Sequence, residues 1–474
     1  QPAPQRASIL QRLLNLTPAR YLLAPLLQRA ASKRVNPLYY PAPFALIDHW
    51  KRCGGNRQAL FASEATQVGR LLIGETSQNL IRVFFLQERL KSLASESEFQ
   101  PRHVHVVGGG IMGGDIAAWC ALKGLRVSLQ DREASYLGNA MGRAHLLFSQ
   151  KLKSPRLTRA AMDRLMPDPK GFGIGQADVI VEAIFEEVAA KQALFQELEA
   201  RARPDALLAT NTSSIPLETI GESLDQPGRL IGLHFFNPVA KMQLIEVVQG
   251  TDTDPIEVTR GAAFACSIDH LPLPVKSSPG FLVNRVLMPY LLEAVALIEE
   301  GLPPAIIDQA AMDFGMPMGP VELADQVGLD ICLAVAEKLA PVYALEIPER
   351  LRRLVRQNHL GRKSGEGFYR YRQGKRIRQR HIGHYRPPGD LTERMIFRLL
   401  NEAVACLCEG VVEDPDLLDA GIIFGTGFAP FRGGPMHYIG SGGLEQRRRQ
   451  LDALAKRHGE QFHPDAGWGN LRGI

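Results

Sequence analysis

The sequence predicts an α/β domain built on a parallel sheet, with a helical segment before it and two all-α domains after it. Short apolar runs alternate with helical stretches between about residues 103 and 276, strands then stop, and one helical pattern occurs twice. The chain has 474 residues. Because a single hydrophobic core stops growing at about 250–300 residues, several domains are expected. We place them at residues 1–100, 101–277, 278–376 and 377–474.

The composition is that of an ordinary globular protein, with 45% hydrophobic and 22% charged residues. The formal net charge of +5 suits an anionic small ligand as well as nucleic acid, and we expect no nucleic-acid partner. No stretch of about 20 uncharged apolar residues occurs, so we expect no membrane span. Six cysteines without a CxxC pair predict free thiols in a reducing compartment, and we expect no metal site.

Residues 1–100 are expected to form a helical connector. Apolar residues follow helical spacing between positions 61 and 90. A large apolar face is a liability when exposed, so we expect this one to rest on the rest of the chain or on a second copy. No acidic residue precedes Asp48, as in an organelle transit segment, but the start at Gln1 favours the interior of a longer polypeptide. The apolar face comprises Leu72, Leu80, Val83 and Phe84.

A glycine cluster follows the first apolar run of the α/β region. Gly108, Gly110 and Gly113 form a GxGxxG pattern, which permits a tight turn, close approach of a pyrophosphate and close helix–strand packing. Asp131 ends the second strand, where a carboxylate accepts hydrogen bonds from ribose hydroxyls and repels a 2′-phosphate. The pattern predicts a Rossmann-type NAD-binding domain. The alternatives are NADP, through Arg132, and a glycine turn without a ligand.

A histidine and a glutamate lie in two successive apolar runs, LIGLHFF and LIEVV. A carboxylate in an apolar strand is costly unless it is paired, and a strand-turn-strand return would place Glu246 beside His234. The carboxylate would then fix the imidazole tautomer, as a general base for a hydroxyl requires. The residues alone leave a satisfied core histidine as an equal alternative.

The run ATNTSSIP leaves another apolar strand at the end that faces the ligand crevice in sheets of this kind. Asn211 and Ser213 could bind a substrate oxygen there. The alternative is a helix N-cap, because serine and threonine are favoured caps.

The region after residue 281 is predicted to be almost entirely helical and to contain a repeat. NRVLMPYLLEAVALIEEG (284–301) resembles ERMIFRLLNEAVACLCEG (393–410) at an offset of 109 residues. FGMPMGP (314–320) resembles FGTGFAP (424–430) at an offset of 110. Two copies of one helical unit are the simplest interpretation, with residues 371–390 as the linker.

Together these motifs resemble the 3-hydroxyacyl-CoA dehydrogenase family. The resemblance covers about residues 104–370, through GGGIMGG, VEAIFEE, NTSSI, HFFNPV, PGFLVNRVLMPYLLEA, FGMPMGP and GRKSGEGFY. The doubled helical pattern is similar to the α subunit of the multifunctional fatty-acid oxidation complex, in which one chain joins an enoyl-CoA hydratase to this dehydrogenase. Residues 38–92 resemble the connector between those parts. The hydratase part is absent, so we expect dehydrogenation without enoyl-CoA hydration.

The resemblance implies NAD-dependent oxidation of an (S)-3-hydroxyacyl-CoA, with His234 as the base and Glu246 as its partner. Ser213 and Asn284 would bind the reacting oxygen and the thioester end, and Tyr438 would touch the acyl-CoA. The residues implied to line the NAD site, besides the glycines and Ser213, are Met112, Asp131, Glu186, Lys191 and Asn237.

Two other function classes compete with this interpretation. A β-hydroxyacid dehydrogenase would use a lysine base on the helix that begins with Asn284 here, and a scaffold subunit would need no intact site. The partners implied by the resemblance are acyl-CoA and a thiolase β subunit, with a homodimer as a further option. We expect a cytoplasmic location, with the mitochondrial matrix as the alternative.

Overall fold

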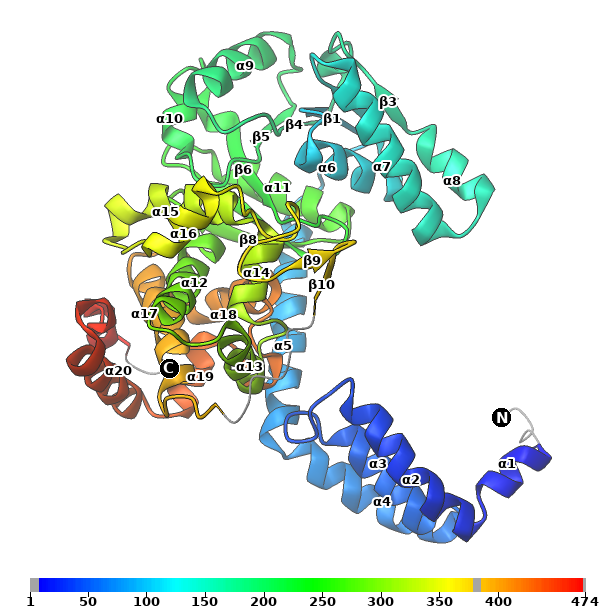
Figure 1. Cartoon of the computed structure of the whole chain (residues 1–474). Helices are drawn as coiled ribbons and strands as arrows, with labels where there is room; N and C mark the ends of the chain where they lie inside the picture. Colours follow the sequence, from blue (N-terminus) through cyan, green and yellow to red (C-terminus); the bar gives the residue numbers. More distant parts are fainter. Residues whose placement is uncertain (1–7, 378–384, 472–474) are drawn as a thin grey trace. The chain divides into compact units, whose positions relative to one another are not determined.

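The computed structural model describes residues 8–377 and 385–471, which form two compact units (Figure 1). The first unit holds the chain up to Phe85 together with Pro430–Gly433, and the second holds the rest. None of the described helices is long and apolar enough to cross a membrane.

Helices α1 to α4 and the start of α5 make up most of the first unit. Arg20 is buried there and donates hydrogen bonds to the Trp50 and Lys51 carbonyls, at 3.0 and 3.1 Å. The rings of Tyr39 and Phe431 stack with centroids 4.3 Å apart. The helices are α1 (Ile9–Leu14), α2 (Thr17–Ser32), α3 (Ala42–Cys53), α4 (Arg57–Leu72) and α5 (Glu75–Ser92).

The helical stretch predicted at residues 61–90 forms parts of two helices. Ile73 and Gly74 interrupt the helix between α4 and α5. The side chain of Asn56 caps α4 by accepting from the Ala59 N–H, so the first helix starts earlier than its apolar pattern. The expected apolar face is not buried as a whole. Leu72 and Phe84 are exposed in the described structure.

An eight-stranded sheet forms the α/β domain of the second unit, in the order β3-β2-β1-β4-β5-β6-β7-β8. Every neighbouring pair is parallel except β6 and β7, which are antiparallel. The predicted parallel sheet is therefore mixed, because the chain returns by a short turn after β6. The strands are β1 (His103–Val107), β2 (Arg126–Gln130), β3 (Leu165–Pro167), β4 (Val179–Glu182), β5 (Leu207–Thr210), β6 (Leu230–Phe235), β7 (Leu244–Gln249) and β8 (Leu271–Lys276).

Helices cover both faces of this sheet. Successive side chains of a strand point to opposite faces, and apolar side chains lie on both. On β4, Val179 and Val181 join one apolar core cluster and Ile180 joins the other. Strand β8 carries Pro272 and Pro274, which an edge strand tolerates because one side of it needs no ladder hydrogen bonds. The helices are α6 (Ile111–Leu122), α7 (Ala134–Leu152), α8 (Pro155–Met162), α9 (Val188–Arg201), α10 (Leu217–Gly221) and α11 (Pro255–Ser267).

Among the residues described after β8, helices make up most of the second unit. A short hairpin of β9 (Tyr371–Arg372) and β10 (Lys375–Arg376) forms where the linker was expected to begin. Residues 378–384 of that linker lie outside the described residues. The helices are α12 (Val283–Glu299), α13 (Pro304–Phe314), α14 (Pro320–Val327), α15 (Leu329–Tyr343), α16 (Glu349–Arg356), α17 (Leu391–Cys408), α18 (Pro415–Thr426), α19 (Pro435–Ser441) and α20 (Leu444–His458).

Helices α12 and α17 exchange ion pairs in a reciprocal way. Arg285 of α12 donates from Nε to Glu402 of α17, at 2.6 Å. Arg394 of α17 donates from Nε to Glu293 of α12, at 2.7 Å. Both arginines are buried, and each arginine and each glutamate has its counterpart 109 residues away. Each arginine also pairs with a second glutamate, Arg285 with Glu409 and Arg394 with Glu300, so removing an arginine would leave two carboxylates without their partner, and these pairs fix how the two helices meet.

Candidate active site

The chain order of the sheet reverses at β1, which lies between β2 and β4. In open α/β sheets a ligand crevice forms at such a point, outside the carboxyl ends of the strands. The glycine cluster lies there, between the end of β1 and the start of α6. Gly108 has a φ of +115°, and a Cβ on Gly113 would lie 1.9 Å from the Gly108 carbonyl oxygen. Neither position accepts a side chain in this turn.

The glycine turn fits a dinucleotide. Gly110 is the N-cap of α6, and a Cβ built on it would meet no atom within 4 Å, so the backbone is open to a ligand on that side. The free N–H groups at a helix N-terminus bind a pyrophosphate. Asp131 follows β2 directly, and its carboxylate accepts from the Gly109 N–H at 2.6 Å. The carboxylate therefore lies beside the turn, where a ribose would follow the phosphates.

His234 and Glu246 face each other across the antiparallel pair β6–β7, where they are direct register partners. Nδ1 of His234 lies 2.7 Å from Oε2 of Glu246. Glu246 is fully buried and only 4% of His234 is exposed. The rings of Phe236 and Phe281 pack on the imidazole, with centroids 4.6 and 5.5 Å away. The strand-turn-strand return expected from the sequence is confirmed.

The other oxygen of Glu246 holds the start of α12. Oε1 accepts from the Leu282 N–H at 3.0 Å and from the Val283 N–H at 2.9 Å. A carboxylate at a helix N-terminus is stabilised by the free N–H groups and by the helix dipole. Both oxygens of this buried carboxylate are thus hydrogen-bonded, which fixes its orientation and that of the imidazole.

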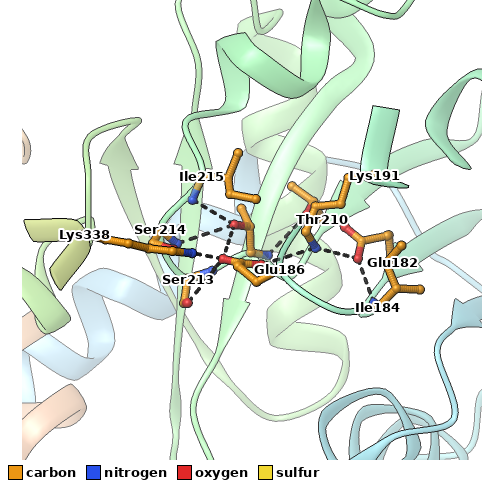
Figure 2. A network of polar contacts seen from close by, with 10 residues as sticks. Glu182, Ile184, Glu186, Lys191, Thr210, Ser213, Ser214, Ile215 and Lys338 are labelled. Carbon is orange, nitrogen blue, oxygen red and sulfur yellow. Dashed lines mark hydrogen bonds and ion pairs between the residues drawn. The ribbon is translucent and has the colours of Figure 1, made fainter. Parts of the chain in front are cut away.

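A polar network lies at the ends of β4 and β5 (Figure 2). Oε1 of Glu186 accepts from Thr212 Oγ1 at 2.7 Å, from the Ser213 N–H at 3.0 Å and from Ser214 Oγ at 3.0 Å. Lys191 is buried and lies 2.6 Å from Oε1 of Glu182 and 3.4 Å from Oε2 of Glu186. Two carboxylates and a run of hydroxyl groups are therefore concentrated beside the crevice.

Charges and hydrogen bonds keep Glu186 ionised. Burial acts to raise the pKa of its carboxyl, but Lys191, the bonds from Thr212 and Ser213, and Lys338 outweigh it and hold the pKa below its usual value. Lys338 belongs to α15 and donates from Nζ to Ser214 Oγ at 2.8 Å. The helical part of the unit thus contributes to a network otherwise built from the sheet domain.

Comparisons with known proteins identify the family. The family model described as "3-hydroxyacyl-CoA dehydrogenase, NAD binding domain" matches residues 103–278, and that of the C-terminal domain matches residues 280–371. Fatty acid oxidation complex subunit alpha of Shewanella sp. (strain W3-18-1) is 33% identical, over 98% of this chain and 69% of its own length. The protein of that name from Shewanella baltica gives the same values.

Solved structures agree. The 3-hydroxybutyryl-CoA dehydrogenase of Escherichia coli aligns with a TM-score of 0.71 and 26% identity, covering 78% of this chain and 98% of that one. The dehydrogenase part of multifunctional enzyme 1 from C. elegans aligns with a TM-score of 0.60 and 25% identity, covering 84% and 99%. The chain belongs to the 3-hydroxyacyl-CoA dehydrogenase family. It is an NAD-dependent oxidoreductase, as the sequence predicted.

The asparagines expected in the dehydrogenase site have different surroundings. Asn211 accepts at Oδ1 from the Phe235 N–H, at 2.9 Å, and so ties the end of β5 to the end of β6. Asn284 lies partly buried in the first turn of α12. Asn237 is exposed in the turn after β6, and Met112 packs partly buried against the sheet core from the first turn of α6.

The N-cap alternative for Asn211 and Ser213 is wrong. The N-cap of α10 is Pro216, without a side-chain cap bond, because Ile215 and Pro216 separate the polar run from the first helical residue, Leu217. Ser213 instead bonds Glu186 through its N–H, and its Oγ lies 3.3 Å from the same carboxylate oxygen.

Tyr438 lies in an aromatic cluster of the helical part. Its ring packs against Phe314 and Phe428, with centroids 5.4 and 6.5 Å away, and the Arg447 guanidinium lies 4.2 Å from its centroid. The contact with acyl-CoA that the resemblance implied stays a prediction.

Two charged members of the polar network were not found from the sequence. Glu182 ends the apolar strand VIVE and is fully buried, so the argument that singled out Glu246 would have found it too. Lys338 gives no such signal, because it lies on an exposed stretch of helix, 124 residues after its partner Ser214.

Proposed function

We propose that this dehydrogenase oxidises (S)-3-hydroxyacyl-CoA to 3-ketoacyl-CoA, with His234 as general base and Glu246 as its orienting partner. The observation that supports this role is the 2.7 Å contact between Nδ1 of His234 and Oε2 of Glu246. A neutral imidazole that donates from Nδ1 to a carboxylate presents Nε2 as an acceptor. That nitrogen can take the proton of a substrate hydroxyl.

The proton and the hydride leave the substrate in different directions. His234 takes the hydroxyl proton, and the buried carboxylate of Glu246 stabilises the imidazolium that results. NAD, which the turn of Gly108, Gly110 and Gly113 and the carboxylate of Asp131 would hold, would supply the hydride acceptor for C3. We assign Ser213 and Asn284 to the reacting oxygen and the thioester end, where their hydroxyl and amide groups can donate to an oxygen. The apolar walls formed by Phe236 and Phe281 exclude water from the imidazole.

The cofactor site proposed for the dehydrogenase follows the crevice. The turn of Gly108, Gly110 and Gly113 binds the pyrophosphate, and Asp131 binds the adenosine ribose, because it lies beside that turn after β2. The network of Glu186 and its partners lies at the neighbouring strand ends β4 and β5, which suits the nicotinamide half. The residues proposed to complete the NAD site are Met112, Glu186, Lys191, Ser213 and Asn237.

We further propose that residues 278–376 and 377–474 are two copies of one helical domain, in which Tyr438 of the second copy contacts acyl-CoA. The reciprocal pairs Arg285–Glu402 and Arg394–Glu293 support the duplication, since they relate positions 109 residues apart. Residues 1–100 would be the connector to a further domain, as the resemblance implies.

The proposed setting is fatty-acid oxidation in the bacterial cytoplasm. The relatives are named as alpha subunits of a fatty acid oxidation complex and come from Shewanella, which supports a second subunit as a partner, and the resemblance implies that this is a thiolase β subunit. A homodimer is the other assembly to test. Size-exclusion chromatography with light scattering, with and without a thiolase subunit, separates these assemblies.

One assay tests the proposed function. The purified chain should oxidise NADH when acetoacetyl-CoA is supplied, and His234→Gln should abolish most of this turnover. A scaffold subunit would show no turnover in either form. A dehydrogenase with a different base would lose little activity in the variant, and that result would remove His234 from the mechanism.

A further inference from the structure

A lysine from the helical part reaches the turn that follows β5. Nζ of Lys338, on α15, lies 2.8 Å from Ser214 Oγ. Ser214 Oγ lies in turn 3.0 Å from Oε1 of Glu186 (Figure 2). An ammonium only donates and a carboxylate only accepts, so the direction of the relay is fixed. Lys338 donates to Ser214, and Ser214 donates to Glu186.

The oxygen at the end of this relay holds the whole turn. Besides Ser214, Oε1 of Glu186 accepts from Thr212 Oγ1 at 2.7 Å and from the Ser213 N–H at 3.0 Å. Ser213 Oγ lies 3.3 Å from the same oxygen. The position of Ser213 therefore depends on where the Glu186 carboxylate is held.

Lys191 alone does not balance the charge of this cluster. It contacts Glu182 at 2.6 Å and Glu186 only at 3.4 Å. Glu182 is fully buried and takes the shorter contact, so Glu186, whose side chain is 27% exposed, keeps only the longer one and can accept a second cationic partner. Lys338 supplies it through Ser214, and its charge is one of the causes that lower the pKa of Glu186, against burial, which acts first to raise it.

We propose that Lys338 is a positioning residue for hydride transfer, which acts through Ser214 on Glu186 and so fixes the turn that carries Ser213. The proposal rests on the proposed roles of Ser213 and Glu186. Lys338 is an exposed residue that contacts the turn through Nζ, so it acts through Ser214 and not on the reacting atoms. The helical part thereby contributes to the geometry at the nicotinamide end of the crevice.

The first test is a double-mutant cycle in steady-state turnover of acetoacetyl-CoA and NADH. Lys338→Met and Ser214→Ala should each lower kcat by about 3- to 30-fold, with KM for acetoacetyl-CoA changed less than kcat. The double variant should be no slower than the slower single variant, because both remove one relay. Lys338→Arg should regain most of the activity, since it keeps the charge and the donors. Losses that multiply, or a kcat of Lys338→Met within about twofold of the wild type, would overturn the proposal.

The control is Lys363→Met. Lys363 forms an ion pair with Asp330 of the same helix α15, at 2.6 Å, and among the described contacts it bonds no residue of the turn. This variant should keep kcat within about twofold of the wild type. A loss in the control as large as in Lys338→Met would show that any lysine contact on α15 has this effect, and would contradict a relay.

A second readout needs neither cofactor nor turnover. In hydrogen–deuterium exchange of the cofactor-free chain, the amides of residues 213–215 should exchange faster in Lys338→Met than in the wild type. In Lys363→Met their exchange rates should equal those of the wild type. Unchanged exchange in Lys338→Met would refute the positioning role. Failure of the proposed function looks different: either the wild type would show no turnover, or His234→Gln would keep wild-type turnover, whatever the amide exchange of the Lys338 variants.

Discussion

Replacing Glu246 with glutamine should lower turnover by about 10³- to 10⁴-fold, and the geometry around the carboxylate explains why. Oε2 faces His234 Nδ1, whereas Oε1 accepts from both the Leu282 and Val283 N–H groups. A glutamine has one oxygen for these two sides. If the amide oxygen of the glutamine faced the imidazole, the NH₂ group of the glutamine would face the buried N–H groups of Leu282 and Val283.

That orientation leaves two buried N–H groups unpaired, at a cost of about 1–3 kcal/mol each. The glutamine should therefore turn its NH₂ group to His234, which must then accept at Nδ1 and carry its proton on Nε2. The nitrogen that should take the substrate proton is blocked in this tautomer. The stabilisation of the imidazolium by a charged hydrogen bond, about 1.5–3 kcal/mol, is also lost. The two costs sum to about 3.5–9 kcal/mol, and the expected loss of about 10³- to 10⁴-fold lies in the lower half of that range.

NADH oxidation with acetoacetyl-CoA measures the loss, and NADH binding to the variant should stay within about threefold of the wild type. Glu257→Gln is the matched control, since Glu257 is a buried carboxylate of the same domain that pairs with Arg260 at 2.8 Å. Its kcat should change less than about twofold. If Glu246→Gln loses less than about tenfold, the argument from the tautomer is wrong.

His234→Gln should lower kcat by about 10²- to 10⁴-fold with little change in NADH binding, and wild-type turnover would remove it from the mechanism. Asp131→Ser should weaken NAD binding and improve the relative use of NADP, unless the wild type already prefers NADP. Calorimetry should find one acyl-CoA site per chain, because Glu393 stands where the first copy has Asn284 and an ionised carboxylate cannot donate to a carbonyl. Burial raises the pKa of Asp308 to about 6, so the folded chain binds its proton more tightly than the unfolded chain between about pH 4 and 6. Across that window the free energy of unfolding in urea should fall with rising pH by up to about 3 kcal/mol more in the wild type than in Asp308→Asn; equal slopes would contradict this.

The sequence was sufficient for those parts of the site that depend on short-range patterns. The glycine spacing predicted the turn between β1 and α6, and the cost of an unpaired carboxylate in an apolar strand predicted that Glu246 returns beside His234. Both predictions involve residues on neighbouring elements. A local pattern is enough in such cases because the register of two adjacent strands fixes which side chains meet.

Local sequence patterns did not predict contacts between residues far apart in the chain, or which strand lies at the edge of the sheet. Nothing near Lys338 in the sequence indicates that it meets Ser214, 124 residues away. The strand β8 carries Pro272 and Pro274, which are unfavourable in a central strand and acceptable only at the edge that the fold creates. The exposed Leu72 shows the converse, because apolar spacing predicts a face but not what covers it.

The crossed contacts of α12 and α17 have a consequence for how the protein responds to dilution. Arg285 pairs with Glu402, and Arg394 pairs with Glu293. The arginine of each helix therefore pairs with the glutamate of the other, and the two arginines, like the two glutamates, are 109 positions apart. This is the arrangement of a two-fold interface between identical subunits, but both partners lie on one polypeptide. A dimer interface is lost as subunits are diluted, whereas covalently joined partners stay at a fixed effective concentration. The midpoint of thermal unfolding of these two helices should therefore not depend on protein concentration.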